Sequence, residues 1–125
     1  MKTIKSKKLT RRSLPSEVQL SLKISQAKKA EDIVVLDLRG LASFTDYFII
    51  MNGNSTRQNM AIYQAIEENL KKAQVLPLGV EGETTAEWIL LDYGHFIIHI
   101  FSRRARDYYG LEKLWGDAPS IAVKS

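Results

Sequence analysis

The segment of residues 87–101 (EWILLDYGHFIIHIF) constrains the fold most, because it predicts a β-hairpin whose two faces differ. A two-residue turn at Tyr93-Gly94 would set the strand pairing, since the turn of a short hairpin determines its register. The opposed pairs expected from this turn are Asp92 with His95, Leu90 with Ile97, and Trp88 with His99. The chain therefore contains at least one antiparallel pair of strands.

The two faces of this hairpin follow from the alternation of side chains along a strand. One face is apolar except for Glu87 at its outer end, and consists of Ile89, Leu91, Phe96, Ile98 and Ile100. That face predicts a core. The other face carries Trp88, Leu90, Asp92, His95, Ile97, His99 and Phe101. A face that mixes aromatic, imidazole and carboxylate groups predicts either a recognition surface or a second, less complete layer of packing.

Composition limits the classes of protein that this chain can belong to. Its 125 residues fit one domain that can bury a core without covalent crosslinks. The absence of cysteine excludes disulfides and thiolate chemistry. No run of about 18 apolar residues is present, and the N-terminus lacks the apolar segment of a secretory signal. We therefore expect a soluble, cytoplasmic protein.

The net charge of +4 is unevenly distributed. Residues 1–13 contain six Lys or Arg and no acid, so the rest of the chain is mildly acidic. We interpret residues 1–13 as a basic, disordered tail that can attract the phosphate backbone of RNA by counterion release. A solvated and partly dispensable terminus explains the same residues equally well.

Hydrophobic periodicity predicts the remaining elements. Helices are expected over residues 15–30 and from the capping box of Ser55 and Gln58 to about residue 73. Strands are expected over 32–38 and 46–52, with a weak edge strand over 74–80 that Pro77 interrupts. Two short helices follow the hairpin, at residues 103–109 and from residue 111.

These elements define an α/β (α+β) fold of order α-β-β-α-β-β-β-α-α, with helices packed on a mixed five-stranded sheet. We assign residues 14–117 to a single domain, and residues 118–125 to a C-terminal tail.

Catalytic and metal-binding interpretations of the hairpin are weak. His95 and His99 are four strand residues, about 13 Å, apart, and no further His or Cys can complete a metal site. Asp92 opposite His95 could form an acid–base pair, but a local hydrogen bond beside a turn explains the same pair. We therefore expect no metal, no cofactor and no catalytic residue.

Gly53-Asn54-Ser55 before a helix could cradle a phosphate, as in a nucleotidyltransferase using Asp37 or Asp46. A turn followed by an N-cap already explains the three residues, and the glycine spacing is not that of a P-loop. Near the C-terminus, Arg103, Arg104 and Arg106 adjoin Tyr108 and Tyr109, a combination that suits nucleic acid or a protein partner. Nucleotide binding and general RNA binding therefore remain the alternative functions.

Several separated motifs resemble the ribosomal silencing factor family (RsfS, also called Iojap) from about residue 32 to residue 117. They are Leu36-Asp37-Leu38, Thr45-Asp46-Tyr47-Phe48, Gly53 with Ser55-Thr56-Arg57-Gln58, Val80-Glu81-Gly82, Trp88 with Leu91-Asp92-Tyr93-Gly94, His99 with Phe101, Arg106 with Tyr109, and Leu111-Glu112 with Trp115. The resemblance implies a nucleotidyltransferase-like fold without enzymatic activity. It also implies a translational repressor that binds the large ribosomal subunit through its ribosomal protein L-fourteen and sterically blocks joining of the small subunit.

A function of this kind requires a surface rather than a reaction, and we predict that the mixed hairpin face supplies it. The predicted partner-binding residues are Trp88, Leu90, Asp92, His95, Ile97, His99 and Phe101, flanked by Arg106, Tyr108 and Tyr109. Trp88→Ala and His99→Ala should weaken binding to the large subunit, since buried aromatic anchors dominate interfaces. Near-normal binding of both would move the predicted site to the region of Tyr47 and Arg57. An exposed apolar face would also favour a homodimer of the free protein.

Overall fold

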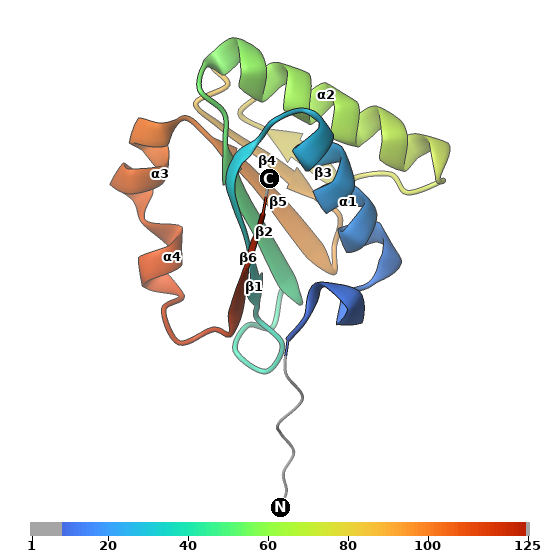
Figure 1. Ribbon diagram of the computed structural model, residues 1–125, viewed down its shortest axis with the longest axis vertical. Helices are drawn as coiled ribbons and strands as arrows, with labels where there is room; N and C mark the ends of the chain where they lie inside the picture. Colours follow the sequence, from blue (N-terminus) through green and yellow to red (C-terminus); the bar gives the residue numbers. More distant parts are fainter. Residues whose placement is uncertain (1–8, 125) are drawn as a thin grey trace, which may run out of the picture.

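The structure is a computed structural model that describes residues 9–124, which contain one mixed six-stranded sheet. The strands are β1 (Glu31–Asp37), β2 (Tyr47–Asn52), β3 (Gly79–Glu81), β4 (Trp88–Asp92), β5 (Phe96–Phe101) and β6 (Ser120–Val123), in the spatial order β3-β4-β5-β2-β1-β6. β2 and β5 are parallel at the centre, and the other neighbouring pairs are antiparallel. The described residues are thus arranged around a single sheet (Figure 1).

The helices divide unequally between the two sides of this sheet (Figure 1). α1 (Ser16–Ala27) and α2 (Thr56–Lys72) cover one side, which we call the covered face. The shorter α3 (Arg103–Tyr109) and α4 (Leu111–Leu114) lie on the other side, which we call the open face. Each face of a sheet must bury its apolar side chains against another layer. The longer helices α1 and α2 bury more of their face than the shorter α3 and α4 do.

The covered face holds the larger core. Its strand residues include the apolar hairpin side chains Ile89, Leu91, Phe96, Ile98 and Ile100, all fully buried, as the alternation of the hairpin predicts. From α1 come Val18 and Leu22, and from α2 come Ile62, Ile66 and Leu70. Within each helix these residues recur at intervals of four, which places them on one stripe facing the sheet.

The predicted order of nine elements is confirmed, but the prediction of five strands is wrong. The sixth strand, β6, lies in the segment 118–125 that the sequence analysis assigned to a tail, and it pairs antiparallel with β1. Its four residues (SIAV) carry no clear periodicity, and their partner is about 85 residues away in the chain. This segment becomes a strand because it pairs with the backbone of β1 at the edge of the folded sheet.

The first element also begins earlier than predicted. Arg11–Ser13 form a 3-10 turn, η1, which Thr10 caps by accepting a hydrogen bond from the Ser13 amide at 3.2 Å. The following Leu14 is buried in the covered core. The last residues of the predicted basic tail are therefore ordered, whereas residues 1–8 of that prediction lie outside the described residues.

The hairpin has the predicted faces but a different register. Its turn is Gly94-His95 rather than Tyr93-Gly94, because the Tyr93 amide donates to the Phe96 carbonyl at 2.9 Å. Gly94 has a φ of +90°, which suits the first central position of a hairpin turn. The true pairs are Asp92 with Ile97, Leu90 with His99, and Trp88 with Phe101. A slip of two residues leaves the strand side chains on their predicted faces, but it moves His95 from the mixed face into the turn, beside Glu17 of α1.

Candidate protein-binding surface

The open face is a second, smaller apolar layer that α3 and α4 cover only in part. Its buried members are Leu36, Leu38, Phe48, Ile50, Ile97, Phe101 and Ala105. Leu111 and Trp115, in and just after α4, pack against this layer and are themselves only partly buried. A sheet face with so short a helical cover leaves apolar side chains in contact with solvent.

A row of aromatic rings runs obliquely across the strands of the open face. Trp115 packs edge-on against Phe48 of β2, with ring centroids 6.1 Å apart. Phe48 contacts His99 of β5 at 4.4 Å, and His99 lies 6.0 Å from Trp88 of β4. Trp88 in turn packs against Tyr109 of α3 at 4.6 Å. The row, defined as these five residues, joins α3 to the segment after α4 across three strands.

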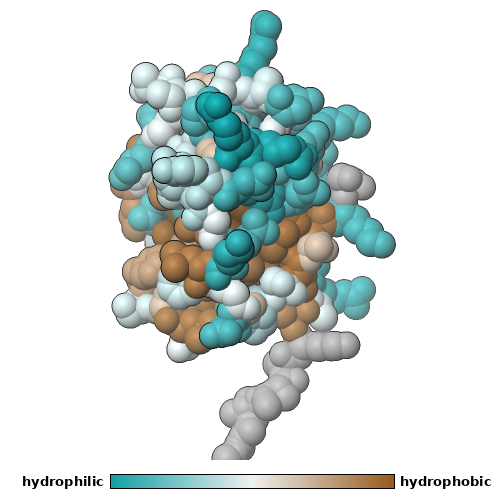
Figure 2. Space-filling view, turned by 90° about the vertical axis from the view of Figure 1, so that its left-hand side faces the viewer, coloured by the Kyte–Doolittle hydropathy of each residue, from teal (hydrophilic) through white to brown (hydrophobic). Residues whose placement is uncertain are grey.

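Large exposed apolar side chains surround one end of this row. Phe44 is 57% exposed, and its ring lies 6.2 Å from that of Trp115. Leu41 and Leu114 are 49% and 72% exposed, and both line one depression with Trp115. Figure 2 views the side on which α3 and α4 lie, and shows hydrophobic surface gathered in the lower half below a hydrophilic upper region. We call Leu41, Phe44, Leu114 and Trp115 the apolar rim.

The predicted site residues differ widely in accessibility. Phe101 is fully buried, and His99 and Ile97 are only 3% and 8% exposed. Trp88, Leu90, Asp92 and Arg106 are half-buried, and His95, Tyr108 and Tyr109 are exposed. Within the hairpin, a partner could therefore contact Trp88 and Leu90 directly, whereas the buried residues support them from below. The prediction that this set binds a partner stays a prediction.

His99 is held neutral beneath the surface. Its Nδ1 accepts a hydrogen bond from Trp88 Nε1 at 3.1 Å, which orients the indole ring. Burial lowers the pKa of His99 to about 3, because the imidazolium form would lose its hydration among aromatic rings. His99 is thus a positioning residue for Trp88 in this structure.

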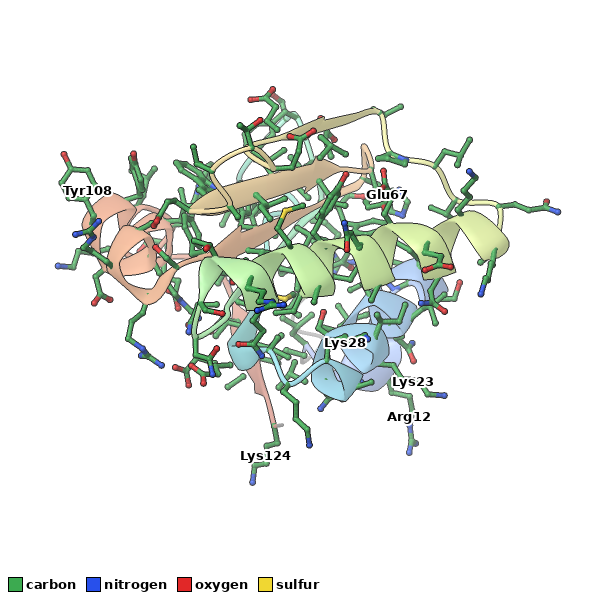
Figure 3. All side chains as sticks on the ribbon, turned by 90° about the horizontal axis from the view of Figure 1, so that it is seen from above. Arg12, Lys23, Lys28, Glu67, Tyr108 and Lys124 are labelled. Atoms are coloured by element: carbon green, nitrogen blue, oxygen red, sulfur yellow. The ribbon has the colours of Figure 1, made fainter. Side chains whose placement is uncertain are left out.

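Arg106 is committed to contacts within the protein. Its guanidinium forms a two-pronged pair with the Glu112 carboxylate, at 2.9 and 3.0 Å, and donates to Asn52 Oδ1 at 2.8 Å. Asn52 ends β2, whereas Glu112 lies in α4. The arginine therefore fastens the α3–α4 segment to the end of the central strand. Tyr108, by contrast, extends away from the body at the outer side of α3 (Figure 3).

The proposed Asp92–His95 pair does not form across the hairpin. Asp92 Oδ1 accepts from the Gly94 amide at 2.8 Å and so stabilises the turn. His95 lies in the turn, where its Nε2 is 3.8 Å from Glu17 Oε1 of α1. The corrected register separates the two side chains, because Asp92 is opposite Ile97 instead.

Two backbone amides of the segment 53–55, which was considered as a phosphate cradle, already donate hydrogen bonds to side chains of α2. The Gly53 amide donates to Asn59 Oδ1 at 2.9 Å, and the Asn54 amide donates to Gln58 Oε1 at 2.7 Å. Ser55 Oγ caps α2 by accepting from the Gln58 amide at 3.0 Å, as predicted. In a standard capping box the Gln58 side chain would accept from the amide of Ser55. Here it accepts from the amide of Asn54, one residue earlier. This turn is explained by helix capping alone.

Asp37, one of the two acids considered for nucleotidyltransferase chemistry, is paired within the protein. Asp37 accepts two hydrogen bonds from the Arg39 side chain, at 2.9 and 2.8 Å. Burial, the largest single effect, would raise the pKa of Asp37, but the side-chain bonds, the bond from the Arg39 backbone amide and the positive charge of Arg39 together lower it. Residues 9–124 contain no group of three His, Asp or Glu side chains arranged to hold a metal ion. Within the same residues, no helix has the length and apolar character needed to cross a membrane.

Sequence reasoning missed the apolar rim. Leu41 and Phe44 occur in the loop between β1 and β2, and Leu114 was expected only as part of the beginning of the last short helix. Apolar residues in a loop with Gly, Ser and Asp are the only signal that could have indicated them, since loops are normally polar. Tyr47, considered as an alternative site, is buried, and its ring lies 5.3 Å from the Arg39 guanidinium. Arg57 is exposed near the start of α2.

The fold and this surface define a small α+β protein whose most distinctive exposed feature is apolar and aromatic. The family described as ribosomal silencing factor during starvation, RsfS, matches residues 11–125, and the chain belongs to this family. The family name denotes a regulator of the ribosome and not an enzyme, in agreement with the sequence analysis.

Individual relatives agree with this assignment. A Bacillus subtilis protein named ribosomal silencing factor RsfS is 43% identical over 102 residues, which cover 78% of this chain and 86% of the relative. A crystal structure of a Chromobacterium violaceum protein superposes with a TM-score of 0.78 at 35% identity, covering 80% of this chain and 83% of that one. A mouse protein named mitochondrial assembly of ribosomal large subunit protein 1 is 30% identical over 102 residues, covering 79% of this chain and 45% of the mouse protein.

Proposed function

We propose that this protein represses translation by binding the large ribosomal subunit through ribosomal protein L-fourteen and by sterically blocking the small subunit. The proposal places this action in the cytoplasm, where the two subunits join. The large subunit is the natural candidate because the mouse relative is named for assembly of that subunit. The identity of the ribosomal protein comes from the resemblance of the sequence motifs to the silencing factors.

The observation that carries the proposal is the coincidence of the aromatic row with the apolar rim on one side of the sheet. Trp88 and Tyr109 lie at one end of the row, whereas Phe44 and Leu114 adjoin Trp115 at the other. Half-buried aromatic side chains on a rigid support are typical anchors of protein interfaces. Because they belong to strands β4 and β2 and to the α4 region, a partner would meet a preformed surface.

Repression then requires only that the protein occupies its binding site on the large subunit. A folded domain of this size, bound at the face of the large subunit that meets the small subunit, would exclude the small subunit by overlap of volume. No bond is made or broken, which agrees with the occupied amides at residues 53–54 and with the paired carboxylate of Asp37. We also propose that the sheet is a nucleotidyltransferase-like fold that has lost its chemistry.

The test is sedimentation of the full chain with isolated large subunits, followed by a subunit-joining assay. Trp88→Ala should reduce binding at least tenfold, because truncation of a central aromatic anchor typically costs about 2 kcal/mol or more. A matched control is Tyr63→Ala, which removes a partly buried aromatic side chain of α2 from the opposite side of the sheet. The control should bind normally once folding has been verified by circular dichroism.

Equal losses in both variants would indicate general destabilisation and would contradict the assignment of this face. Joining assays give a separate check, since wild-type protein should prevent joining only when it is bound beforehand to the large subunit. Saturating protein that binds without preventing joining would refute steric blocking.

The same face could hold two copies of the free protein together, and we include a homodimer in the proposal because exposed apolar patches tend to be covered. Sedimentation equilibrium of the wild-type and Trp88→Ala proteins tests this point. Dimerisation that resists Trp88→Ala and Phe44→Ser would place the contact elsewhere.

A further inference from the structure

Five exposed basic side chains gather on a different side of the molecule from the aromatic row. They are Arg12, Lys23, Lys28, Lys29 and Lys124, and we call them the basic side. Figure 3 shows Arg12, Lys23 and Lys124 extending in one common direction on the side where Lys28 also lies, with Tyr108 far from them at the end of α3. These residues come from η1, α1, the turn after α1 and the end of β6, so the sequence does not display them as one cluster.

Hydrogen bonds among these segments hold the basic side together. Arg11 donates from its guanidinium to Gln26 Oε1 at 2.8 Å, and the Gln26 amide donates to the Lys124 carbonyl. Gln19 Nε2 donates to the Arg12 carbonyl at 3.3 Å, which fixes η1 beside α1. The basic side chains are thus carried by a connected framework rather than by independent loops.

The five basic residues of this side form no ion pair within residues 9–124. Glu17 is the only acid among residues 9–30, and its carboxylate lies beside the imidazole of His95, not beside one of the five basic residues. The two acids that follow, Glu31 and Asp32, lie 2.9 and 3.6 Å from the Arg103 guanidinium.

The arrangement suits an extended polyanion better than a small anion. The five cations are spread over the surface of several segments, and the depression beside them mixes Lys29 and Arg103 with Glu31 and Asp32. A phosphate backbone can contact separated cations in succession, and each contact releases a counterion. The solvent-facing surface of α2 offers a contrast, because Glu67 and Glu68 there balance Lys71 and Lys72.

We propose that the basic side binds the phosphate backbone of RNA, as a second contact that is independent of the open face. Its source in ribosomal RNA rests on the proposed function, whereas the chemistry of the contact does not. Since α1 packs on the covered face and the aromatic row lies on the open face, one molecule could engage RNA and a ribosomal protein at the same time.

The experiment measures binding of the full chain to deproteinised large-subunit RNA over a range of KCl concentrations. Lys23→Gln with Lys28→Gln removes two charges of the basic side. The matched control, Lys71→Gln with Lys72→Gln, removes two exposed charges near the C-terminal end of the other long helix. The first pair of substitutions should make the negative slope of log K against log salt shallower by about 1.5. Each lost phosphate contact reduces the magnitude of this slope by about 0.7 to 0.9.

The control pair should leave that slope close to the wild-type value. Equal slopes for the two pairs would show that only net charge matters and would overturn the proposal, as would absence of RNA binding by the wild-type protein. Stronger binding to anionic phospholipid vesicles than to RNA, with the same sensitivity to Lys23 and Lys28, would overturn the choice of RNA.

Trp88→Ala distinguishes this proposal from the proposed function. It should weaken binding to the intact large subunit but leave binding to naked RNA unchanged. Failure of subunit binding together with salt-dependent RNA binding through Lys23 and Lys28 would refute the proposed function alone.

Discussion

The covered and open faces of the sheet are built from the same strands, yet they are completed in different ways. On the covered face, α1 and α2 bury Ile98 and Ile100 fully. On the open face, α3 and α4 leave Trp88 and Leu90 half-buried, and Phe44 and Leu114 largely exposed. The first face therefore supplies most of the stability, whereas the second retains apolar surface that only a partner could bury. This difference indicates that the incomplete packing of the open face can itself be the functional feature.

The largest expected effect contrasts one truncation on each face. Ile98→Ala should reduce the free energy of unfolding by about 3 to 4 kcal/mol, because it leaves a cavity in a fully buried core. Leu90→Ala, on the half-covered face, should cost about 1 kcal/mol, since less apolar area is lost. Urea denaturation at neutral pH measures both values. Similar costs would show that the open face is as completely packed as the covered one.

The next effect concerns the pH dependence of stability through His99. Burial lowers the pKa of His99 to about 3, below its value of about 6.5 in the unfolded chain, so the unfolded state binds more protons between these values. Stability should therefore fall by about 2 kcal/mol as the pH decreases from 7 to 5. His99→Gln should abolish this part of the dependence, whereas His95→Gln, which alters the exposed turn, should retain it. An unchanged dependence in His99→Gln would contradict a buried, neutral imidazole.

A smaller loss is expected where the open face is fastened to the sheet. Arg106→Lys keeps the charge but cannot reproduce the two-pronged pair with Glu112 or the bond to Asn52. The free energy of unfolding should decrease by about 1 to 2 kcal/mol. Hydrogen exchange should also show faster opening of amides in α3 and α4 than in α2. Uniform acceleration across both faces would mean that α3 and α4 are not a separate unit.

The smallest effect on stability is expected at the apolar rim. Phe44→Ser and Leu114→Ser should each change the free energy of unfolding by less than about 0.5 kcal/mol, because both side chains are mostly exposed. The same substitutions should weaken binding to the large subunit. A stability loss above about 1 kcal/mol would indicate that the rim serves packing, and undiminished binding would exclude it from the interface.

Much of the fold could be predicted from the sequence, because the relevant signals are local. The alternation of residues 87–101 identified both hairpin faces, and the helical spacing of Ile62, Ile66 and Leu70 identified the core stripe of α2. The hairpin register was wrong because Gly94 can serve at either central position of a two-residue turn. A choice between two adjacent turns depends on which hydrogen bonds the whole sheet permits.

The candidate site was less predictable than the fold. His99 and Phe101 share a face with Trp88, yet they are buried because neighbouring strands, aromatic rings and the α3 segment surround them. Arg106 was expected at an interface, but it pairs with Asn52, 54 residues earlier in the chain. Contacts over such separations leave no periodic trace in a sequence.

The sequence by itself determined the order of the helices and strands, the two faces of the hairpin and membership of the family, since each is written in residue types at short and regular spacings. Only the tertiary structure decided that β6 completes the sheet, that three of the seven residues of the mixed face are buried, and that the basic residues of four segments share one side. The physical reason is that alternation is a property of the covalent backbone, whereas exposure depends on which distant segments pack against a face.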